Sequence, residues 1–321
     1  MDALQTNTPL AAFRGAKPQA PGWFAHALAQ AAERALVTVA GARIETLAWG
    51  ERGRPGLLLL HGNGAHADWY SFIAPHLTGE RRVVAMSWSG MGGSDWRKTY
   101  SRELFVSEAL EVAHATGLFA AGQAPVVVGH SFGGRIAIAL AAEHGEKFHA
   151  AVLVDPPVFS LEHPRDRAER SRRPTPRMRE LKPHRVYASL EAALARFRFA
   201  PSQGCANLFI ADYIARRSLR PAAREGGGEG WTWRFDPFLW RDLRMGDPMP
   251  QIGAARCPIA LIRGADSRLM KPEDASSMMR ILPQGSPFIE IPDADHHVMV
   301  DQPLAFIEAL AKLLATWPTS G

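Results

Sequence analysis

The sequence predicts an α/β fold in which a mostly parallel sheet is covered by helices on both faces. Residues 57–60 and 126–128 are short runs without a single polar side chain, which is typical of strands buried on both faces. Helical patterns separate such runs, and strands that alternate with helices indicate a parallel sheet. The 321 residues can bury a substantial core, and no apolar run reaches the length of a membrane span.

Each element follows from its local pattern. The first 22 residues are polar and contain prolines, so we expect an arm over the surface, and residues 23–36 have weak helical spacing. Residues 37–39 and 44–49 predict a β-hairpin. The further predicted strands are 57–60, 83–86, 126–128, 150–154, 259–262 and 288–291. The predicted helices are 68–77 with Asp68 as N-cap, 102–116, the alanine-rich stretch after Ser131, 272–281 and 303–314.

Between residues 159 and 250 the alternation stops, and Arg, Pro and aromatic residues become frequent. Helical patterns lie near 190–199 and 207–218. We expect an insertion after the sixth core strand. The predicted organisation is an N-terminal arm and helix (1–35), the first part of the core (36–158), an inserted cap (159–250) and the second part of the core (251–321).

The formal net charge is +5, and the arginines crowd into residues 165–185. Prolines and acidic residues interrupt this stretch, and it contains no Phe, Tyr or Trp that could stack on bases. We therefore expect a solvated surface and no nucleic-acid partner. Cys205 and Cys257 are too few for a disulfide scaffold, and the N-terminus lacks a signal-peptide pattern, so we expect a cytoplasmic protein without a membrane partner. The sequence leaves undecided whether the protein forms a homodimer.

The most informative stretch is Gly129-His-Ser-Phe-Gly133. It is a G-x-S-x-G motif placed between a valine-rich strand and a helical stretch, which is the context of a nucleophilic serine held in a strained turn. Ser131 would then stand at the carboxyl edge of the sheet, above the N-terminus of a helix, where partial positive charge favours a developing anion.

These residues, together with Leu57-Leu-Leu-Leu-His-Gly-Asn-Gly64, Ser89-Gly-Met-Gly-Gly-Ser94 and Ile291-Pro-Asp-Ala-Asp-His296, give a sequence that resembles the α/β-hydrolase superfamily. The resemblance runs from about Val37 to Leu314, and the cap matches only in position and length. It implies an α/β-hydrolase fold with a mostly parallel eight-stranded sheet, helices on both faces and an inserted helical cap.

The resemblance implies that Ser131 is the nucleophile and that His296 is its general base. His297 is the competitor, and Asp295 stands where the family usually has glycine, but Asp301-Gln302-Pro303 favours the register of His296. The backbone N–H groups of Phe132 and Asn63 would form the oxyanion hole, with Gly64 as an alternative to Asn63. His61 is expected to hold its loop rather than to take part in the reaction.

The sequence does not decide which carboxylate completes a catalytic triad with Ser131 and His296. The residue that usually carries it falls on Ser267, with Asp266 one position earlier. Asp155, at the end of the sixth strand, is the other candidate, although an aspartate there can simply cap a turn before Pro156-Pro157. A carboxylate is needed to hold the imidazole tautomer. Asp155 is slightly favoured because Ser267 breaks the usual pattern.

Substrate contacts are predicted for Trp88, His130 and Gly62. Trp88 and three further tryptophans could wall an apolar acyl pocket or form the core of the cap: Trp231, Trp233 and Trp240. No metal or other cofactor is expected, because His61, His66 and Asp68, like Asp293, Asp295, His296 and His297, lack a recognised ligand spacing.

The predicted function is a serine hydrolase that cleaves a small-molecule ester or lactone. C–C bond hydrolysis, acyl transfer, a lyase step and a non-catalytic binding protein are the alternatives.

Overall fold

The computed structural model describes residues 8–158 and 181–317. In this part of the chain one sheet has eight strands in the order β1-β2-β4-β3-β5-β6-β9-β10. Pairs β1–β2 and β2–β4 are antiparallel, and every pair from β4 to β10 is parallel, as the sequence predicts. The strands are β1 (Glu33–Val39), β2 (Ala42–Trp49), β3 (Gly56–Leu60), β4 (Arg82–Met86), β5 (Val126–His130), β6 (Ala150–Val154), β9 (Ile259–Gly264) and β10 (Phe288–Ile291).

The core forms two apolar layers because successive side chains of a strand point to opposite faces. Leu57 and Leu59 of β3 belong to one layer, and Leu58 and Leu60 belong to the other. One face is covered by α2 (Arg102–Ala115), α3 (Phe132–His144), α7 (Pro248–Gly253) and α8 (Pro272–Met279), and η5 (Gly145–Lys147) follows α3. The other face is covered by α1 (Gly22–Ala29), η3 (Ala67–Tyr70), η4 (Ala74–Leu77), α9 (Val298–Asp301) and α10 (Pro303–Thr316). The short η2 (Ala11–Phe13) precedes α1 and buries none of its residues.

Two predicted elements differ from the structure. The helix expected over 68–77 is replaced by η3 and η4, since Pro75 lacks an N–H and its ring would clash with the preceding turn of an α-helix. The Asp68 carboxylate does not cap a helix but accepts hydrogen bonds from Arg34 and Tyr213. The helical spacing expected over 23–36 ends at Ala29, because Glu33 already pairs with Ala48 in the hairpin.

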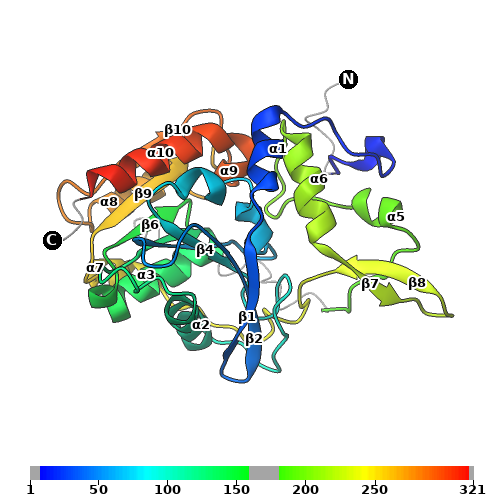
Figure 1. Cartoon of the computed structure of the whole chain (residues 1–321), viewed down its shortest axis with the longest axis horizontal. Helices are drawn as coiled ribbons and strands as arrows, with labels where there is room; N and C mark the ends of the chain where they lie inside the picture. Colours follow the sequence, from blue (N-terminus) through cyan, green and yellow to red (C-terminus); the bar gives the residue numbers. More distant parts are fainter. Residues whose placement is uncertain (1–7, 159–180, 318–321) are drawn as a thin grey trace.

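The inserted segment contains α5 (Leu190–Leu194), α6 (Leu208–Arg217) and an antiparallel pair formed by β7 (Leu219–Ala223) and β8 (Glu229–Trp233). The expected helical cap is therefore mixed in its described part. Figure 1 shows α6 beside α1, with β7 and β8 projecting to one side of the sheet. Helix α7 packs against α3 and straddles the boundary drawn at residue 250. Most of the arginine-rich stretch, from Arg165 to Arg179, lies outside the described residues.

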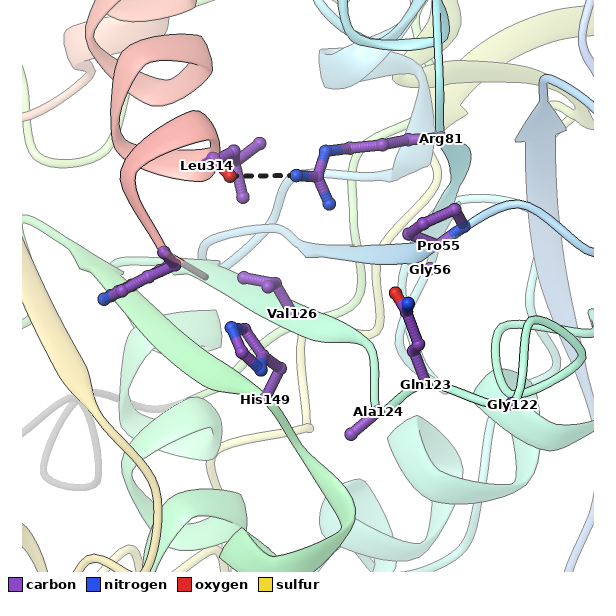
Figure 2. A pocket seen from close by; sticks show the side chains of 10 residues that line it. Pro55, Gly56, Arg81, Gly122, Gln123, Ala124, Val126, His149 and Leu314 are labelled. Carbon is purple, nitrogen blue, oxygen red and sulfur yellow. Dashed lines mark hydrogen bonds between the residues drawn. The ribbon is translucent and has the colours of Figure 1, made fainter. Parts of the chain in front are cut away.

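A hollow of about 240 Å³ lies at the amino ends of the central strands (Figure 2). Gly56 and Val126 mark the starts of β3 and β5 there, and Arg81 donates a 2.9 Å hydrogen bond to the Leu314 carbonyl. Ser131 follows the carboxyl end of β5, so this hollow is on the wrong edge of the sheet to serve it. None of the described helices is both long and apolar enough to cross a membrane.

Candidate active site

Ser131 lies in the tight turn between β5 and α3. Its φ of 53° and ψ of −116° are a backbone conformation that a non-glycine residue adopts only under constraint. The turn closes because Gly129 and Gly133 have no side chains: a Cβ on Gly129 would lie 2.3 Å from the Gly133 carbonyl oxygen, and one on Gly133 would lie 2.3 Å from the Leu60 carbonyl oxygen. This is the strand–turn–helix geometry of a nucleophile elbow.

His296 meets Ser131 from the loop between β10 and α9. Its Nε2 lies 2.9 Å from Ser131 Oγ, and its Nδ1 lies 2.7 Å from Asp155 Oδ2. Both His296 and Asp155 are fully buried, while Ser131 keeps 8% of its surface exposed. With a proton on Nδ1 bonded to the carboxylate, Nε2 is free to accept the proton of the serine hydroxyl. Three side chains from three separate parts of the chain thus form one hydrogen-bonded series.

The Asp155 carboxylate is held on both oxygens. Oδ2 also accepts a 2.7 Å hydrogen bond from Ser267 Oγ, and Oδ1 accepts a 3.3 Å bond from the Gly264 N–H. Ser267 Oγ in turn accepts from the Met270 N–H at 3.1 Å. The position where the resemblance places an acid therefore holds a serine that bonds to the carboxylate of Asp155.

Asp266 is not part of this arrangement. Its backbone N–H bonds to the Ala294 carbonyl and its side chain is exposed, with no side-chain hydrogen bond to a described residue. Of the two candidate acids, only Asp155 contacts His296. Strands β6 and β9 are neighbours and end at the same edge of the sheet, so a carboxylate after either strand could lie near His296.

Two backbone N–H groups lie beside Ser131 and remain available. Phe132 is the first residue of α3, whose first N–H groups have no partner within the helix. The loop after β3 is also close, because a Cβ on Gly62 would lie 3.1 Å from Ser131 Cβ. Asn63 turns its side-chain oxygen to Trp240 Nε1 at 2.8 Å, and within the described chain its own N–H has no acceptor.

Two buried histidines near the site, His61 and His130, are held by hydrogen bonds to neighbouring parts of the protein. His61 Nδ1 contacts the Gly62 carbonyl at 2.7 Å, its Nε2 accepts from the Trp88 N–H at 3.1 Å, and burial lowers its pKa to about 3. It holds its loop, as its position in the sequence suggests. His130 Nε2 lies 2.9 Å from the His296 carbonyl oxygen, and burial takes its pKa well below its usual value.

The structure gives Trp88 and His130, for which substrate contacts are predicted, buried positions with partners in the protein. Trp88 is fully buried, donates from Nε1 to the His61 carbonyl and packs edge-on against Phe132 at 5.9 Å between ring centroids. It lies behind the site rather than in it. His130 is engaged by the backbone of His296 and positions that loop. Gly62 is buried against the elbow, so only its backbone can face a substrate.

His297 is buried beside His296, and its ring nitrogens make no hydrogen bond of ordinary geometry, although the Pro201 carbonyl interacts with the ring. Its ring packs near Trp69 and Phe199, with centroids 5.3 and 5.1 Å away. One ring nitrogen from each of His130, His296 and His297 lies within 4.8 Å of the others. Serine, carboxylate and carbonyl groups already occupy His296 and His130, so this trio is a poor ligand set for a metal.

Sequence reasoning missed the links between the inserted segment and the histidine loop. Gln203 accepts a 3.0 Å hydrogen bond from the His297 N–H and donates to the Asp301 carboxylate at 2.8 Å. Asn207 donates to the Val300 and Asp301 carbonyls. Burial raises the pKa of Asp301 to about 7. No local pattern signals these contacts, because the partners lie more than ninety positions apart.

The geometry agrees with the comparisons. The model of the α/β-hydrolase-fold family matches residues 55–303, so the chain belongs to this family and is a hydrolase. It is 29% identical over 284 residues to an esterase of Mycobacterium tuberculosis, and the aligned part covers 85% of this chain and 87% of that protein.

Solved structures share the fold. The structure of the M. tuberculosis esterase superposes with a TM-score of 0.67 at 24% identity, covering 97% of this chain and 99% of that one. A thioesterase domain from the curacin biosynthetic pathway reaches a TM-score of 0.69 at 23% identity, covering 89% of this chain and all of that one.

Proposed function

We propose that this hydrolase cleaves a carboxylic ester or a lactone of a small molecule, through an acyl-enzyme on Ser131 and without a cofactor. The observation that carries the proposal is the hydrogen-bonded series from Ser131 through His296 to Asp155, with the serine in a strained turn at the carboxyl edge of the sheet. Similarity to an esterase supports the choice of ester chemistry.

In the first step, Ser131 Oγ attacks the carbonyl carbon while His296 Nε2 takes the hydroxyl proton. A neutral serine hydroxyl is a weak nucleophile, so a base within hydrogen-bond reach is required, and the 2.9 Å contact supplies it. Asp155 holds the Nδ1 proton and stabilises the imidazolium that forms. Ser267 and the Gly264 N–H keep the carboxylate oriented toward His296.

The carbonyl oxygen becomes an anion in this step. The Phe132 and Asn63 N–H groups are the donors that we assign to it, and their action is largest in the transition state, where the charge develops. The partial positive charge at the N-terminus of α3 acts in the same direction.

The imidazolium of His296 then gives its proton to the leaving alcohol, and the acyl group stays on Ser131. A water molecule deprotonated by His296 attacks the acyl carbon, the acid leaves, and the proton returns to Ser131. Lactone opening follows the same steps, except that the leaving hydroxyl stays attached to the acyl group.

Ser131→Ala tests the nucleophile. We expect at least a ~10³-fold loss of ester turnover and no labelling by a fluorophosphonate probe, because the triad acts as a unit. Ser276→Ala, an exposed serine of α8, is the matched control and should behave as wild type. Thermal melting shows whether both variants are folded. A folded Ser131→Ala protein that retains turnover contradicts the proposal.

Product analysis with ester, thioester and carbon–carbon substrates separates the remaining reactions of the same scaffold. Release of acid and alcohol in equal amounts supports ester hydrolysis. Transfer of the acyl group to an added alcohol, or products formed without uptake of water, would replace ester hydrolysis by acyl transfer or by a lyase step. A folded wild-type protein that a fluorophosphonate does not label would indicate a binding protein.

A further inference from the structure

A pocket of about 540 Å³ opens beside the candidate active site. Asn63 and Gly64 of the proposed oxyanion loop form part of its wall, and so does His297, the neighbour of His296. Most of the other lining residues come from the inserted segment, and Thr8 and Trp69 complete the wall. The pocket is large enough for a drug-sized group, and its position makes it the place for one side of a substrate.

The walls of the pocket are mainly aromatic. Trp69 from η3 meets Phe199 edge-on, with ring centroids 5.9 Å apart, and Phe199 meets Phe197 at 5.1 Å. Trp233 lies 6.4 Å from Phe197 and 6.2 Å from Tyr187. These rings support one another across the core and the inserted segment, so a bulky apolar group finds a preformed surface.

The pocket also has a buried polar group in its wall. His297 is 4% exposed, and its ring nitrogens make no hydrogen bond of ordinary geometry, although the Pro201 carbonyl interacts with the ring. A buried polar atom whose hydrogen bonds are incomplete is costly in a native protein. Burial lowers the pKa of His297 well below its usual value, so the neutral ring can both donate and accept a hydrogen bond. A bound molecule with a polar atom at this point would complete the wall.

The charged side chains that line the pocket are all positive. Arg196 and Arg198 line it, their side chains are exposed, and no ion pair joins either of them to a described Asp or Glu. No Asp or Glu is among the described residues of the lining. Arg185 adds a third cation over the ring of Tyr187, 5.6 Å from its centroid. The arginines therefore make the solvent side of the pocket positive, while aromatic rings form much of its interior.

We infer that the substrate carries a bulky apolar group with an anionic substituent, which the aromatic pocket and Arg196 and Arg198 bind together. This inference rests on the proposed ester hydrolysis and names the class of its substrate. Guanidinium groups suit carboxylates because they offer several fixed N–H donors.

Two matched pairs of esters test the inference. In the first, the acyl group is 3-(4-carboxyphenyl)propanoate or 3-(4-methylphenyl)propanoate, with p-nitrophenol as the leaving group. In the second, the same aryl groups are on the alcohol of an acetate ester. We expect wild type to prefer the carboxylate member of at least one pair in kcat/KM, and the preference to shrink as KCl is raised from 50 to 500 mM, because exposed charges are screened.

The double variant Arg196→Gln/Arg198→Gln should reduce that preference by about three- to tenfold, mostly by raising KM for the carboxylate esters. The matched control is Arg224→Gln/Arg244→Gln, which removes two exposed arginines outside the pocket lining and should keep the preference. All four positions are exposed, so melting temperatures should stay close to that of wild type.

The two hypotheses fail in different ways. Equal use of charged and neutral members in both pairs, or a preference that survives the pocket variant, overturns the inference and leaves ester hydrolysis intact. Absence of hydrolysis of every ester, with no fluorophosphonate labelling of Ser131, overturns the proposed function itself.

Discussion

The turn at Ser131 and the inserted segment over it are stabilised in different ways. The turn is a local structure: five consecutive residues, two of them glycines that allow backbone to touch backbone, hold the serine at the end of β5. The inserted segment depends on distant partners, such as the Gln203–Asp301 hydrogen bonds and the Phe24–Phe209 ring contact at 4.9 Å. A rigid turn suits the chemical step, whereas long-range contacts determine the shape and charge of the pocket.

The largest expected effect concerns the buried carboxylate. Asp155→Asn should lower kcat by on the order of 10³–10⁴-fold, because an amide no longer holds the Nδ1–H tautomer of His296. Asp266→Asn, whose side chain is exposed, should keep near-normal kinetics. Steady-state ester hydrolysis with both variants checks this. Reversed results would assign the acid to Asp266.

Alanine substitutions at one glycine of the turn and one glycine of the inserted segment compare how much stability each region loses. In Gly133→Ala the new Cβ would lie 2.3 Å from the Leu60 carbonyl oxygen, so backbone must shift, at a cost of about 3 kcal/mol in the free energy of unfolding. Gly227→Ala, between β7 and β8, meets no atom within 4 Å but has a φ of 98°, and should cost about 1 kcal/mol. Urea unfolding measures both. Equal losses would mean that the turn tolerates a side chain.

The last expected effect is the pH dependence at Asp301, a residue that hydrogen bonds join to Gln203 of the inserted segment. Burial raises its pKa to about 7, so the folded protein holds this proton more tightly than the unfolded chain. The carboxyl therefore favours folding below about pH 4, and its contribution is lost as the pH rises toward 7. Relative to Asp301→Asn, wild type should lose up to about 4 kcal/mol of unfolding free energy from pH 4 to pH 8, because each unit by which the pKa is raised corresponds to about 1.4 kcal/mol.

Urea unfolding at several pH values checks this prediction. Asp242→Asn, at an exposed position, is the control and should follow wild type at each pH. A difference between wild type and Asp301→Asn that is constant over this range would contradict the raised pKa of Asp301.

Much of the fold could be predicted from local pattern. The apolar runs gave the strands of the parallel sheet, and Ser101 caps α2 at the predicted start by accepting from the Leu104 N–H at 3.2 Å. Local pattern failed where partners are distant. Pairing with β2 extended β1 back to Glu33 against weak helical spacing, and core packing buried Trp88, for which the sequence predicted a substrate contact.

The sequence by itself determined the elbow, because Gly129, Ser131 and Gly133 act within one turn, and it determined the order of serine and histidine along the chain. Only the tertiary structure shows that Asp155 rather than Asp266 contacts His296, and that His296 rather than His297 contacts Ser131. Ser131, Asp155 and His296 follow β5, β6 and β10, so they meet only when the strands from β5 to β10 lie side by side, and a contact across that edge depends on side-chain direction rather than on spacing. The pocket that we assign to an anionic substrate depends on tertiary structure for the same reason.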